Sequence, residues 1–336
     1  MKKPKILVVG SLVMDLIVSS EKFPSSGESV IGCDFRTAPG GKGANQAVQA
    51  ARLGADVTMV GKVGDDSYGI ALLESLEKSN VDTTYVKKDA SVSSAIGNVQ
   101  LEVHDDTTYN RIIVVPGANM KITPDDVAFL EKEISKYDMV ILQLEIPMQI
   151  NEIVAGYAFH KGVPVMLNSA PFVPISRELL SCLTYISPNE HEAFDITGIY
   201  PDADENIRKA ILSLNTMGVK NALITLGSKG AAFGNDELFL MSPCVDCGKP
   251  TDPTAAGDSF VGAFCTAICL GIDYKDALQF ANCTAGITVS NMGAQPSLPT
   301  IDKVLGVMEE HNFDIKKFES LRECRKKIVK IYERSI

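Results

Sequence analysis

The sequence lacks a surplus of positive charge. Its 336 residues include 32 Lys and Arg against 42 Asp and Glu, which gives a formal net charge of −10. Sequence-independent binding to nucleic acid needs a basic face, so this composition argues against a nucleic-acid partner.

Long apolar runs are also missing. No stretch approaches the roughly 20 apolar residues that a membrane-spanning helix needs, so we expect no membrane span. The first apolar run, Ile6–Val9, is interrupted by Gly10 and Asp15, and this makes it a poor signal peptide. We expect a cytoplasmic protein.

Patterns for a structural metal are scarce as well. Cys244 and Cys247 form a lone CxxC pair, without the second pair of ligands that a zinc site needs. His191 has no partner at the spacing of a zinc site or of a nucleophilic triad. A disulfide framework is not expected in a chain of this length without a secretion signal. The functional signal must come from other residues.

One such signal is the glycine-rich segment Gly40-Gly41-Lys42-Gly43-Ala44-Asn45-Gln46-Ala47, which leads into apolar residues at helical spacing. Gly43 stands where a Walker A loop has Ser or Thr, and the glycine spacing does not fit a dinucleotide fingerprint. Lys42 and Asn45 are expected near the helix start, where they can donate hydrogen bonds to a polyol. The alternative is a glycine turn before an ordinary core helix.

A second glycine-opened helix is expected after Asp252-Pro253-Thr254-Ala255-Ala256-Gly257-Asp258-Ser259-Phe260. The first turn of a helix presents unpaired N–H groups and the positive end of the macrodipole, which together attract an anion. The candidate catalytic residues are Ala255, Ala256 and Gly257 as backbone donors and Asp258 as general base. Such a pairing suits phosphoryl transfer, whereas the simpler alternative is that Asp258 only caps the helix.

The order of the remaining patterns predicts an α/β fold. Short apolar runs, typical of buried parallel strands, alternate with helical patterns and end near Val9, Gln143, Leu167, Ile186 and Thr225. A central, mostly parallel sheet with helices on both faces is therefore expected. Two segments, Asp15–Arg36 and Ala95–Val115, show extended patterns without helices, and we expect them to form antiparallel strands of a small sheet.

Landmarks that follow one another in a set order make the chain resemble the ribokinase branch of the PfkB carbohydrate kinase family. Besides the two glycine motifs they include Gly10–Asp15, Gln143–Glu145, Ser187–Glu192, Ile224–Gly230 and Gly293–Ser297. The resemblance covers about residues 4 to 308. It implies a ribokinase-like α/β fold with a β lid, whose strands lie within about residues 11–36 and 95–115 of a kinase domain spanning residues 1–311. It also implies ATP-dependent phosphorylation of D-ribose at the 5-hydroxyl.

The resemblance implies specific sites in this numbering. For the sugar it implies a group around Asp258 and the first glycine turn: Val13, Met14, Asp15, Gly41, Lys42, Gly43, Ala44, Asn45 and Glu145. For ATP it implies a group from the later strands and helices: Asn189, Thr225, Leu226, Gly227, Ser228, Lys229, Gly230, Gly257 and Asn282. Carboxylates and amides that pair with each hydroxyl discriminate between sugars, because a missing hydroxyl leaves a buried polar group unpaired.

Two metal ions are implied in the same way. Glu192, with Asn189, would hold Mg²⁺ through water, because this ion keeps much of its water shell. A monovalent cation, K⁺, would lie beside the anion site on a set of mostly backbone donors: Asp252, Thr254, Thr288, Asn291, Gly293 and Ser297. Asn291 and Met292 stand where family members often carry Arg or Lys, so this site departs from the family pattern.

The sequence leaves the acceptor and the class of function open to alternatives. The acceptor could be 2-deoxyribose, another sugar or a nucleoside, because few residues of the lid and sugar pocket separate these kinases. A sugar-binding regulator that has lost catalysis is a different class, against which Asp258 and the Asn189/Glu192 pair argue. We also expect a homodimer formed through the lid strands.

The segment 312–336 extends beyond the resemblance as a basic, helical extension. Its apolar residues fall roughly on one helical side, and its basic residues outnumber its acids. A basic amphipathic helix can bind a membrane or an acidic partner. The alternative, which we favour, is an extra helix packed on the acidic body.

Overall fold

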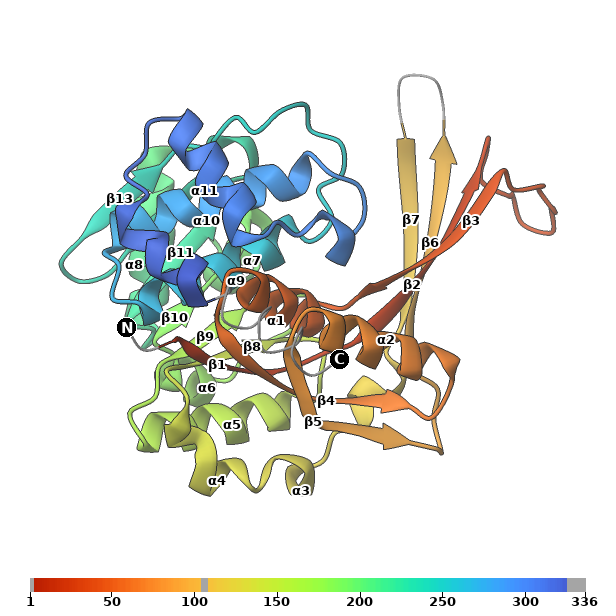
Figure 1. The fold of residues 1–336 in the computed structure, drawn as a ribbon, viewed down its shortest axis with the longest axis horizontal. Coiled ribbons are helices and arrows are strands. Elements are labelled where there is room, and N and C mark those ends of the chain that lie inside the picture. The colour runs from red at the N-terminus through yellow and green to blue at the C-terminus, as the bar shows by residue number, and fades with distance from the viewer. Residues whose placement is uncertain (1–2, 104–107, 325–336) are drawn as a thin grey trace.

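The computed structural model describes residues 3–103 and 108–324, and its centre is a nine-stranded sheet (Figure 1). Neighbouring strands pair in parallel in the order β5 (Val81–Asp89), β4 (Asp56–Gly64), β1 (Lys5–Val9), β8 (Met139–Gln143), β9 (Val165–Asn168), β10 (Tyr185–Ile186) and β11 (Asn221–Thr225). Strands β12 (Ala231–Gly234) and β13 (Phe239–Ser242) continue the sheet antiparallel at one edge. The predicted α/β class is confirmed.

Helices cover both faces of this sheet, and each face has its own apolar core. One core is formed with α1 (Lys42–Arg52), α2 (Ser67–Lys78), α9 (Ala256–Cys269), α10 (Tyr274–Val289) and α11 (Ile301–Glu310). The other is formed with α3 (Pro124–Val127), α4 (Leu130–Glu133), α5 (Met148–His160), α6 (Arg177–Cys182), α7 (Glu190–Thr197) and α8 (Asp204–Thr216). Short 3₁₀ turns lie at η1 (Gly117–Lys121), η2 (Ile134–Lys136), η3 (Gly227–Lys229), η4 (Gln295–Ser297) and η5 (Lys316–Phe318).

Helices α1 and α9 pack unusually close together. A Cβ added to Gly262 of α9 would lie 3.0 Å from the carbonyl oxygen of Gln46 and 3.0 Å from Cβ of Gln49 on α1. Such contacts are tighter than ordinary van der Waals packing, so only glycine fits here without a shift of α1. This approach brings the first turns of the two glycine-opened helices side by side.

A second sheet of four strands projects from the body (Figure 1). Its order is β3 (Asp34–Gly40), β2 (Val13–Ser20), β6 (Ala95–Val103) and β7 (Thr108–Val115). The prediction that its strands are antiparallel was wrong in one place, because β2 and β6 pair in parallel. The long connection between them passes through the central sheet, and a crossover of that length permits parallel pairing.

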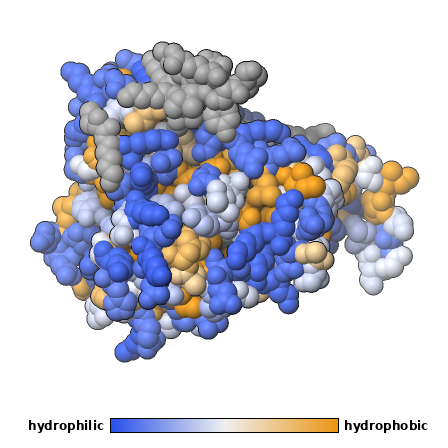
Figure 2. All heavy atoms as spheres, turned by 60° about the horizontal axis from the view of Figure 1, so that its bottom comes forward, coloured by the Kyte–Doolittle hydropathy of each residue, from blue (hydrophilic) through white to orange (hydrophobic). Residues whose placement is uncertain are grey.

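Large apolar side chains are exposed on this second sheet. Phe35, Tyr109, Ile112, Ile113 and Val114 are each more than half exposed. Figure 2 shows hydrophobic side chains at the end of the molecule where the sheet projects. Isolated exposed apolar residues need no explanation, but a contiguous group of them is typical of an interaction surface.

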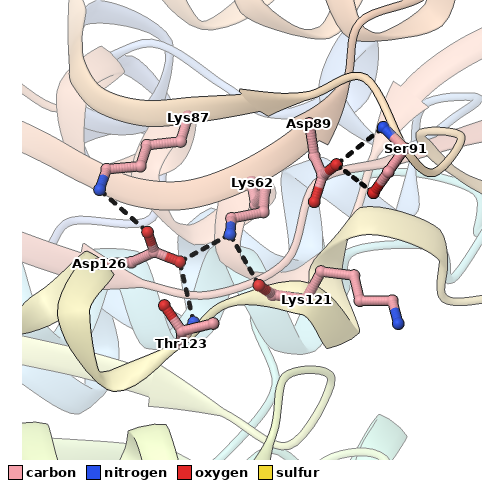
Figure 3. A network of polar contacts seen from close by, with 7 residues as sticks. All are labelled: Lys62, Lys87, Asp89, Ser91, Lys121, Thr123 and Asp126. Carbon is pink, nitrogen blue, oxygen red and sulfur yellow. Dashed lines mark hydrogen bonds and ion pairs between the residues drawn. The ribbon is translucent and has the colours of Figure 1, made fainter.

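A network of charges ties the edge of the central sheet to the start of α3 (Figure 3). The carboxylate of Asp126 accepts hydrogen bonds from Lys62 (2.7 Å), Lys87 (2.9 Å) and the Thr123 N–H (2.8 Å). Burial alone would raise the pKa of Asp126, but these donors hold it well below its usual range. Hydrogen bonds to a charged group typically contribute about 1.5–3 kcal/mol, so this cluster anchors β4 and β5 to the helical layer.

The described part of the C-terminal extension packs on the body. Phe318 is buried and its ring stacks on Phe280 of α10, with 4.5 Å between the ring centroids. Lys317 forms an ion pair with Asp273 (2.9 Å), and Arg322 forms one with Asp302 (2.8 Å). The remaining basic residues of the extension, from Arg325 on, lie outside the described residues.

Within residues 3–103 and 108–324, no helix combines the length and the apolar character needed to cross a bilayer. The cytoplasmic location stays a prediction.

Candidate active site

A single edge of the central sheet carries the polar residues of interest. Parallel strands β1, β8, β9, β10 and β11 all end there, and the carboxyl edge is where open α/β sheets place their ligands. A cavity of about 660 Å³ lies at this edge. Lys42 and Asp258, from the first turns of α1 and α9, lie on its wall.

The start of α1 is built on two glycines that a side chain would disrupt. Gly41 has a φ of 92°, a conformation that L-residues rarely adopt. A Cβ on Gly43 would lie 2.6 Å from the Ser11 nitrogen after β1. The chain therefore turns tightly against the end of β1, as the sequence predicted for a glycine turn.

Ser11 and Glu145 fasten this turn to the sheet. The hydroxyl of Ser11 and the N–H of Lys42 (3.0 Å) both donate to Oε2 of Glu145. The Gly43 N–H donates to the hydroxyl of Ser11 at 3.2 Å. Glu145 is thus oriented toward α1 by groups from two elements. Ser11 was not among the residues predicted for the site, although its place shortly after a buried strand is a usable signal.

The start of α9 has the geometry of an anion site. Ala255 is the N-cap residue, in a left-handed conformation with a φ of 62°, and α9 begins at Ala256. Ala255, Ala256 and Gly257 all line the cavity, and a Cβ added to Gly257 would meet nothing within 4 Å. The N–H of Ala256 donates to the carbonyl of Pro253 at 3.2 Å. The next N–H groups of a first turn lack helical partners by geometry and can face an anion.

Asp258 does not cap this helix. Its buried carboxylate accepts one hydrogen bond from Asn45 Nδ2 (2.9 Å, to Oδ2) and one from Gln46 Nε2 (2.9 Å, to Oδ1). Both donors come from the first turns of α1, so the two glycine-opened helices meet at this carboxylate.

A chain of buried amides continues from Asp258 into the sheet. Gln143, the last residue of β8, donates from Nε2 to Oε1 of Gln46 at 2.8 Å. Asn151 of α5 donates to the Gln143 carbonyl at 2.8 Å. Gln46 and Gln143 are fully buried. The sequence alone indicates no role for either residue, since their contact depends on how α1 packs on β8.

Lys42 lies among negative charges. Burial alone would lower the pKa of its ammonium group, but the charges of Asp258, Glu145 and Glu192 outweigh burial and raise that pKa. The ammonium group of Lys42, which lies at the wall of the cavity near Glu145, therefore stays charged. This is where a transferred anionic group would need compensation.

Asp15 of β2 is the second acid on that side. Burial, and then the charge of Glu145, raise the pKa of Asp15 to about 7. Its carboxylate lies between two glycines, since a Cβ on Gly40 would lie 2.8 Å from Oδ2 and one on Gly97 would lie 2.4 Å from Oδ1. Glycine on the two neighbouring strands leaves room for this carboxylate in the second sheet.

The other residues predicted for a sugar surround this point. Val13 and Met14 are buried at the start of β2, and Ala44 and Asn45 are buried in α1. Within the described part of the chain, Asn45 Oδ1 is buried without a hydrogen-bond partner. Lys42 and Asp258 line the large cavity, so the two predicted sites meet at these two residues.

Most residues predicted for a nucleotide line the cavity. These residues are Asn189, Thr225, Gly227, Ser228, Gly230, Gly257 and Asn282. The two other predicted residues are not among those that line the cavity. Leu226 is buried, and Lys229 Nζ donates to the Asp202 carbonyl at 3.1 Å. The amide of Asn282 donates to the carbonyl (3.0 Å) of Ser242, and so anchors the end of β13 to α10.

The loop after β13 forms a wall of the cavity that sequence reasoning missed. Its residues Cys244 to Gly248 line the cavity together with Ala285, Gly286 and Val289 of α10. The two cysteines of the lone CxxC pair belong to this wall. No sequence signal pointed to it, because the loop reaches the cavity only through its packing on α10.

Asn189 and Glu192 form a reciprocal capping box at the start of α7. Asn189 Oδ1 accepts from the Glu192 N–H at 2.9 Å, and Glu192 Oε2 accepts from the Asn189 N–H at 3.0 Å. Such a box satisfies two otherwise unpaired helix donors. Burial raises the pKa of Glu192, and hydrogen bonds from Asn189 and the charge of Lys42 partly counter it.

The residues that were predicted to bind a monovalent cation lie close together, near the loop that precedes α9. Asp252 accepts from the N–H groups of Thr254 (2.9 Å) and Gly293 (2.8 Å), and so joins two loops. Thr288, Asn291 and Ser297 each donate to a backbone carbonyl three or four residues earlier in the chain. The donor set around them consists of backbone carbonyl, hydroxyl and carboxylate oxygens, which is the chemistry that a hard cation takes.

Comparison with known proteins agrees with this geometry. The model of the pfkB family carbohydrate kinases matches residues 3–301. A ribokinase of Bacillus subtilis is 42% identical over 301 residues, which cover 89% of this chain and 97% of that protein. A deoxyribokinase of Salmonella typhimurium is 32% identical over 299 residues, which cover 89% and 96% of the two chains.

Among solved structures, that of Arabidopsis thaliana ribokinase complexed with ribose and ATP superposes with a TM-score of 0.85 at 34% identity, and the match covers 92% of this chain and 99% of that one. With a family model matched over most of its length, the chain belongs to the pfkB family of carbohydrate kinases.

Proposed function

We propose that this protein phosphorylates D-ribose at the 5-hydroxyl with ATP, giving ribose 5-phosphate and ADP. The observation that carries the proposal is the buried carboxylate of Asp258 in the first turn of α9. Asn45 and Gln46 of α1 each donate a hydrogen bond to it. It lies on the wall of a cavity large enough for a nucleotide. The likeness to relatives named ribokinase supports ribose as the acceptor.

For the sugar, donors and acceptors of the right kind face one another. Asp15 and Glu145 would accept hydrogen bonds from sugar hydroxyls, while Lys42 and the amide of Asn45 would interact with sugar oxygens. Asp15 has room only because its strand neighbours are glycines. Gly41, Gly43 and Ala44 would let the sugar approach the turn of α1, with Val13 and Met14 closing the apolar side.

In the reaction, Asp258 would take the proton of the 5-hydroxyl as the oxygen attacks the γ-phosphorus and ADP leaves. Backbone N–H groups between Ala255 and Asp258, other than that of Ala256, which donates to the Pro253 carbonyl, would stabilise the charge that develops on the phosphoryl oxygens. The Lys42 ammonium, kept charged by its acidic neighbours, would neutralise that group from the other side. Phosphoryl transfer depends chiefly on positioning and charge neutralisation, which these residues provide.

The donor set near the nucleotide suits Mg²⁺ held through water. In the described ranges, no three or more His, Cys, Asp or Glu side chains gather closely enough to bind a metal by themselves. Mg²⁺ keeps several waters and binds through phosphates and one or two carboxylates. Glu192 and Asn189 would hold it, and it would supply charge neutralisation on the phosphates.

K⁺ would be held beside the anion site by Asp252, Thr254, Thr288, Asn291, Gly293 and Ser297. Asp252 already connects the loop before α9 to Gly293. A cation bound to these oxygens would keep the loop, and hence the N–H groups that follow it, in one conformation.

The exposed apolar residues of the second sheet suit a second copy of this chain. Phe35, Tyr109, Ile112, Ile113 and Val114 come from the two outer strands of that sheet. We infer a homodimer in which the second sheets of two protomers pack together, and burial of this surface would stabilise the pair.

Kinases for 2-deoxyribose, another sugar or a nucleoside remain the alternative, supported by the likeness to a deoxyribokinase. A sugar-binding regulator without catalysis is disfavoured by the buried, doubly hydrogen-bonded Asp258.

Asp258→Asn is expected to lower the rate of phosphotransfer by about 10²–10⁴, the usual effect of losing a general base. The change keeps the size of the side chain, so ATP and sugar affinities measured by calorimetry are expected to stay close to those of the parent. Asp236→Asn, at an exposed loop position, is the matched control. A rate within about tenfold of the parent would exclude Asp258 as the base.

Ribose is expected to have a higher kcat/KM than 2-deoxyribose or fructose, measured by ADP release with each sugar. A site whose buried polar groups pair with a hydroxyl rejects the analogue that lacks it. If 2-deoxyribose were the better substrate, the sugar assignment would be wrong and the kinase assignment would stand.

K⁺ is expected to raise kcat over Na⁺ in dialysed enzyme at matched ionic strength, because preorganised N–H donors lose value when they are misplaced. A bulky organic cation serves as the third condition. Equal rates in all three would contradict a functional cation site.

Ile113→Lys is expected to convert dimers to monomers in sedimentation velocity experiments, because a charge would be buried in the apolar contact. Leu212→Lys on α8 is the matched control, since Leu212 and Ile113 are both 64% exposed. A parent protein that is monomeric across the concentration range would refute the dimer.

A further inference from the structure

The loop after β13 brings two thiols to the wall of the cavity. Cys244 and Cys247 both line the cavity, Cys244 as an exposed residue and Cys247 as a partly exposed one. Cys247 also packs against the apolar core that contains a third cysteine, the fully buried Cys283 of α10. One thiol of the loop therefore faces the cavity on one side and a second cysteine on the other.

Cys247 lies tightly against α10. Its thiol donates to the Cys283 carbonyl, with 3.6 Å between Sγ and the oxygen. A Cβ added to Gly286 of the same helix would lie 2.9 Å from Cys247 Sγ and 2.8 Å from the Val245 carbonyl oxygen. Both distances are shorter than real Cβ contacts, so the absence of a side chain at Gly286 is what lets the loop approach the helix this closely.

Contacts on both sides of the thiol hold the loop in this position. Val245 is buried, and the carbonyl of Asp246 accepts a hydrogen bond from His311 Nε2 at 2.8 Å. At the start of the loop, the amide of Asn282 on α10 donates to the Ser242 carbonyl at 3.0 Å. These contacts keep Cys247 beside Cys283.

The contact between the two cysteines makes Cys247 the more acidic thiol. A hydrogen bond between their side chains lowers the pKa of Cys247 and raises that of Cys283. Burial and the charge of Asp246 oppose the lowering of the Cys247 pKa, while the charge of Lys303 supports it. Because the thiolate is the nucleophile, Cys247 is the cysteine of this pair that attacks an oxidant first.

We propose that Cys247 is a modification site for hydroperoxides, and that the oxidised residue forms a disulfide with Cys283 that weakens nucleotide binding. Access to solvent and a second thiol within reach are what peroxide-sensitive cysteines share. The loss of nucleotide affinity rests on the proposed function, whereas the thiol chemistry does not.

The oxidation takes place in two steps. The Cys247 thiolate attacks one oxygen of hydrogen peroxide, the O–O bond breaks, and a sulfenic acid forms while the other oxygen leaves as water with the thiol proton. The Cys283 sulfur then attacks the Cys247 sulfur, the S–O bond breaks, and the hydroxyl leaves as a second water with the proton of Cys283. The two thiols thus lose two electrons to one peroxide molecule.

The disulfide changes the shape of the cavity. Its S–S bond is about 2.05 Å long, so its formation draws Cys247 toward α10. Cys247 is part of the cavity wall, and the wall moves with it. A mismatch of about one methylene between a pocket and its ligand typically costs about 10-fold or more. We therefore expect ADP to bind about 10-fold more weakly after oxidation.

The test treats the reduced protein with a small molar excess of hydrogen peroxide. Mass spectrometry of the digested protein is expected to find a Cys247–Cys283 disulfide, and calorimetry is expected to show the loss of ADP affinity. Dithiothreitol is expected to reverse both changes. Saturating ADP is expected to slow the oxidation of Cys247, which lines the cavity, but not that of Cys33, an exposed cysteine that precedes β3.

Three variants separate this site from the other cysteines. Cys247→Ser is expected to bind ADP equally well before and after peroxide. Cys33→Ser, the matched control, is expected to lose affinity as the parent does. Cys283→Ala removes the partner and is expected to leave Cys247 as a sulfenic acid that dimedone traps. If Cys283→Ala does not fold in thermal unfolding experiments, the disulfide mapped in the parent identifies the partner.

A reduced Cys247 and an unchanged ADP affinity, in a sample whose Cys33 has been oxidised, would overturn the proposal. A disulfide from Cys247 to Cys244 would overturn the assignment of Cys283 as the partner. A reduced parent that bound no ADP would reject the proposed function, while the mapped disulfide would still decide the thiol chemistry.

Discussion

The site depends on the pair of hydrogen bonds that Asn45 and Gln46 donate to the carboxylate of Asp258. They join the first turns of α1 and α9, which lie about 210 residues apart in the chain, as the separations of 213 and 212 positions show. A buried carboxylate is costly unless it is hydrogen-bonded. These amides therefore offset the cost of burying the Asp258 carboxylate next to the start of α9.

The rest of the fold supports this junction. Gly262 allows α9 to approach α1, while Gly41 and Gly43 allow α1 to begin against the end of β1. Gln143 extends the amide chain into the central sheet, so the orientation of Gln46 is set by β8. The hydrogen bonds along this chain fix the orientation of its amides, and a fixed orientation is what a preorganised site requires.

Charge is distributed unevenly around the junction. Lys42 lies among Asp258, Glu145 and Glu192, so an acidic protein presents a cation at the point where an anionic group would be transferred. Asp15, whose pKa is raised to about 7, belongs to the second sheet and not to the central one. The second sheet thus brings a carboxylate to the predicted sugar site.

The sequence by itself determined the local features, which are the apolar strands of the α/β core and the two glycine-opened helices, since these depend on neighbours close in the chain. Only the tertiary structure decided what depends on packing between distant segments. The parallel pairing of β2 with β6, the Gln143–Gln46–Asp258 chain and the loop wall after β13 are of this kind. Each requires the register of one element against another, and periodicity within a single element carries no information about that register.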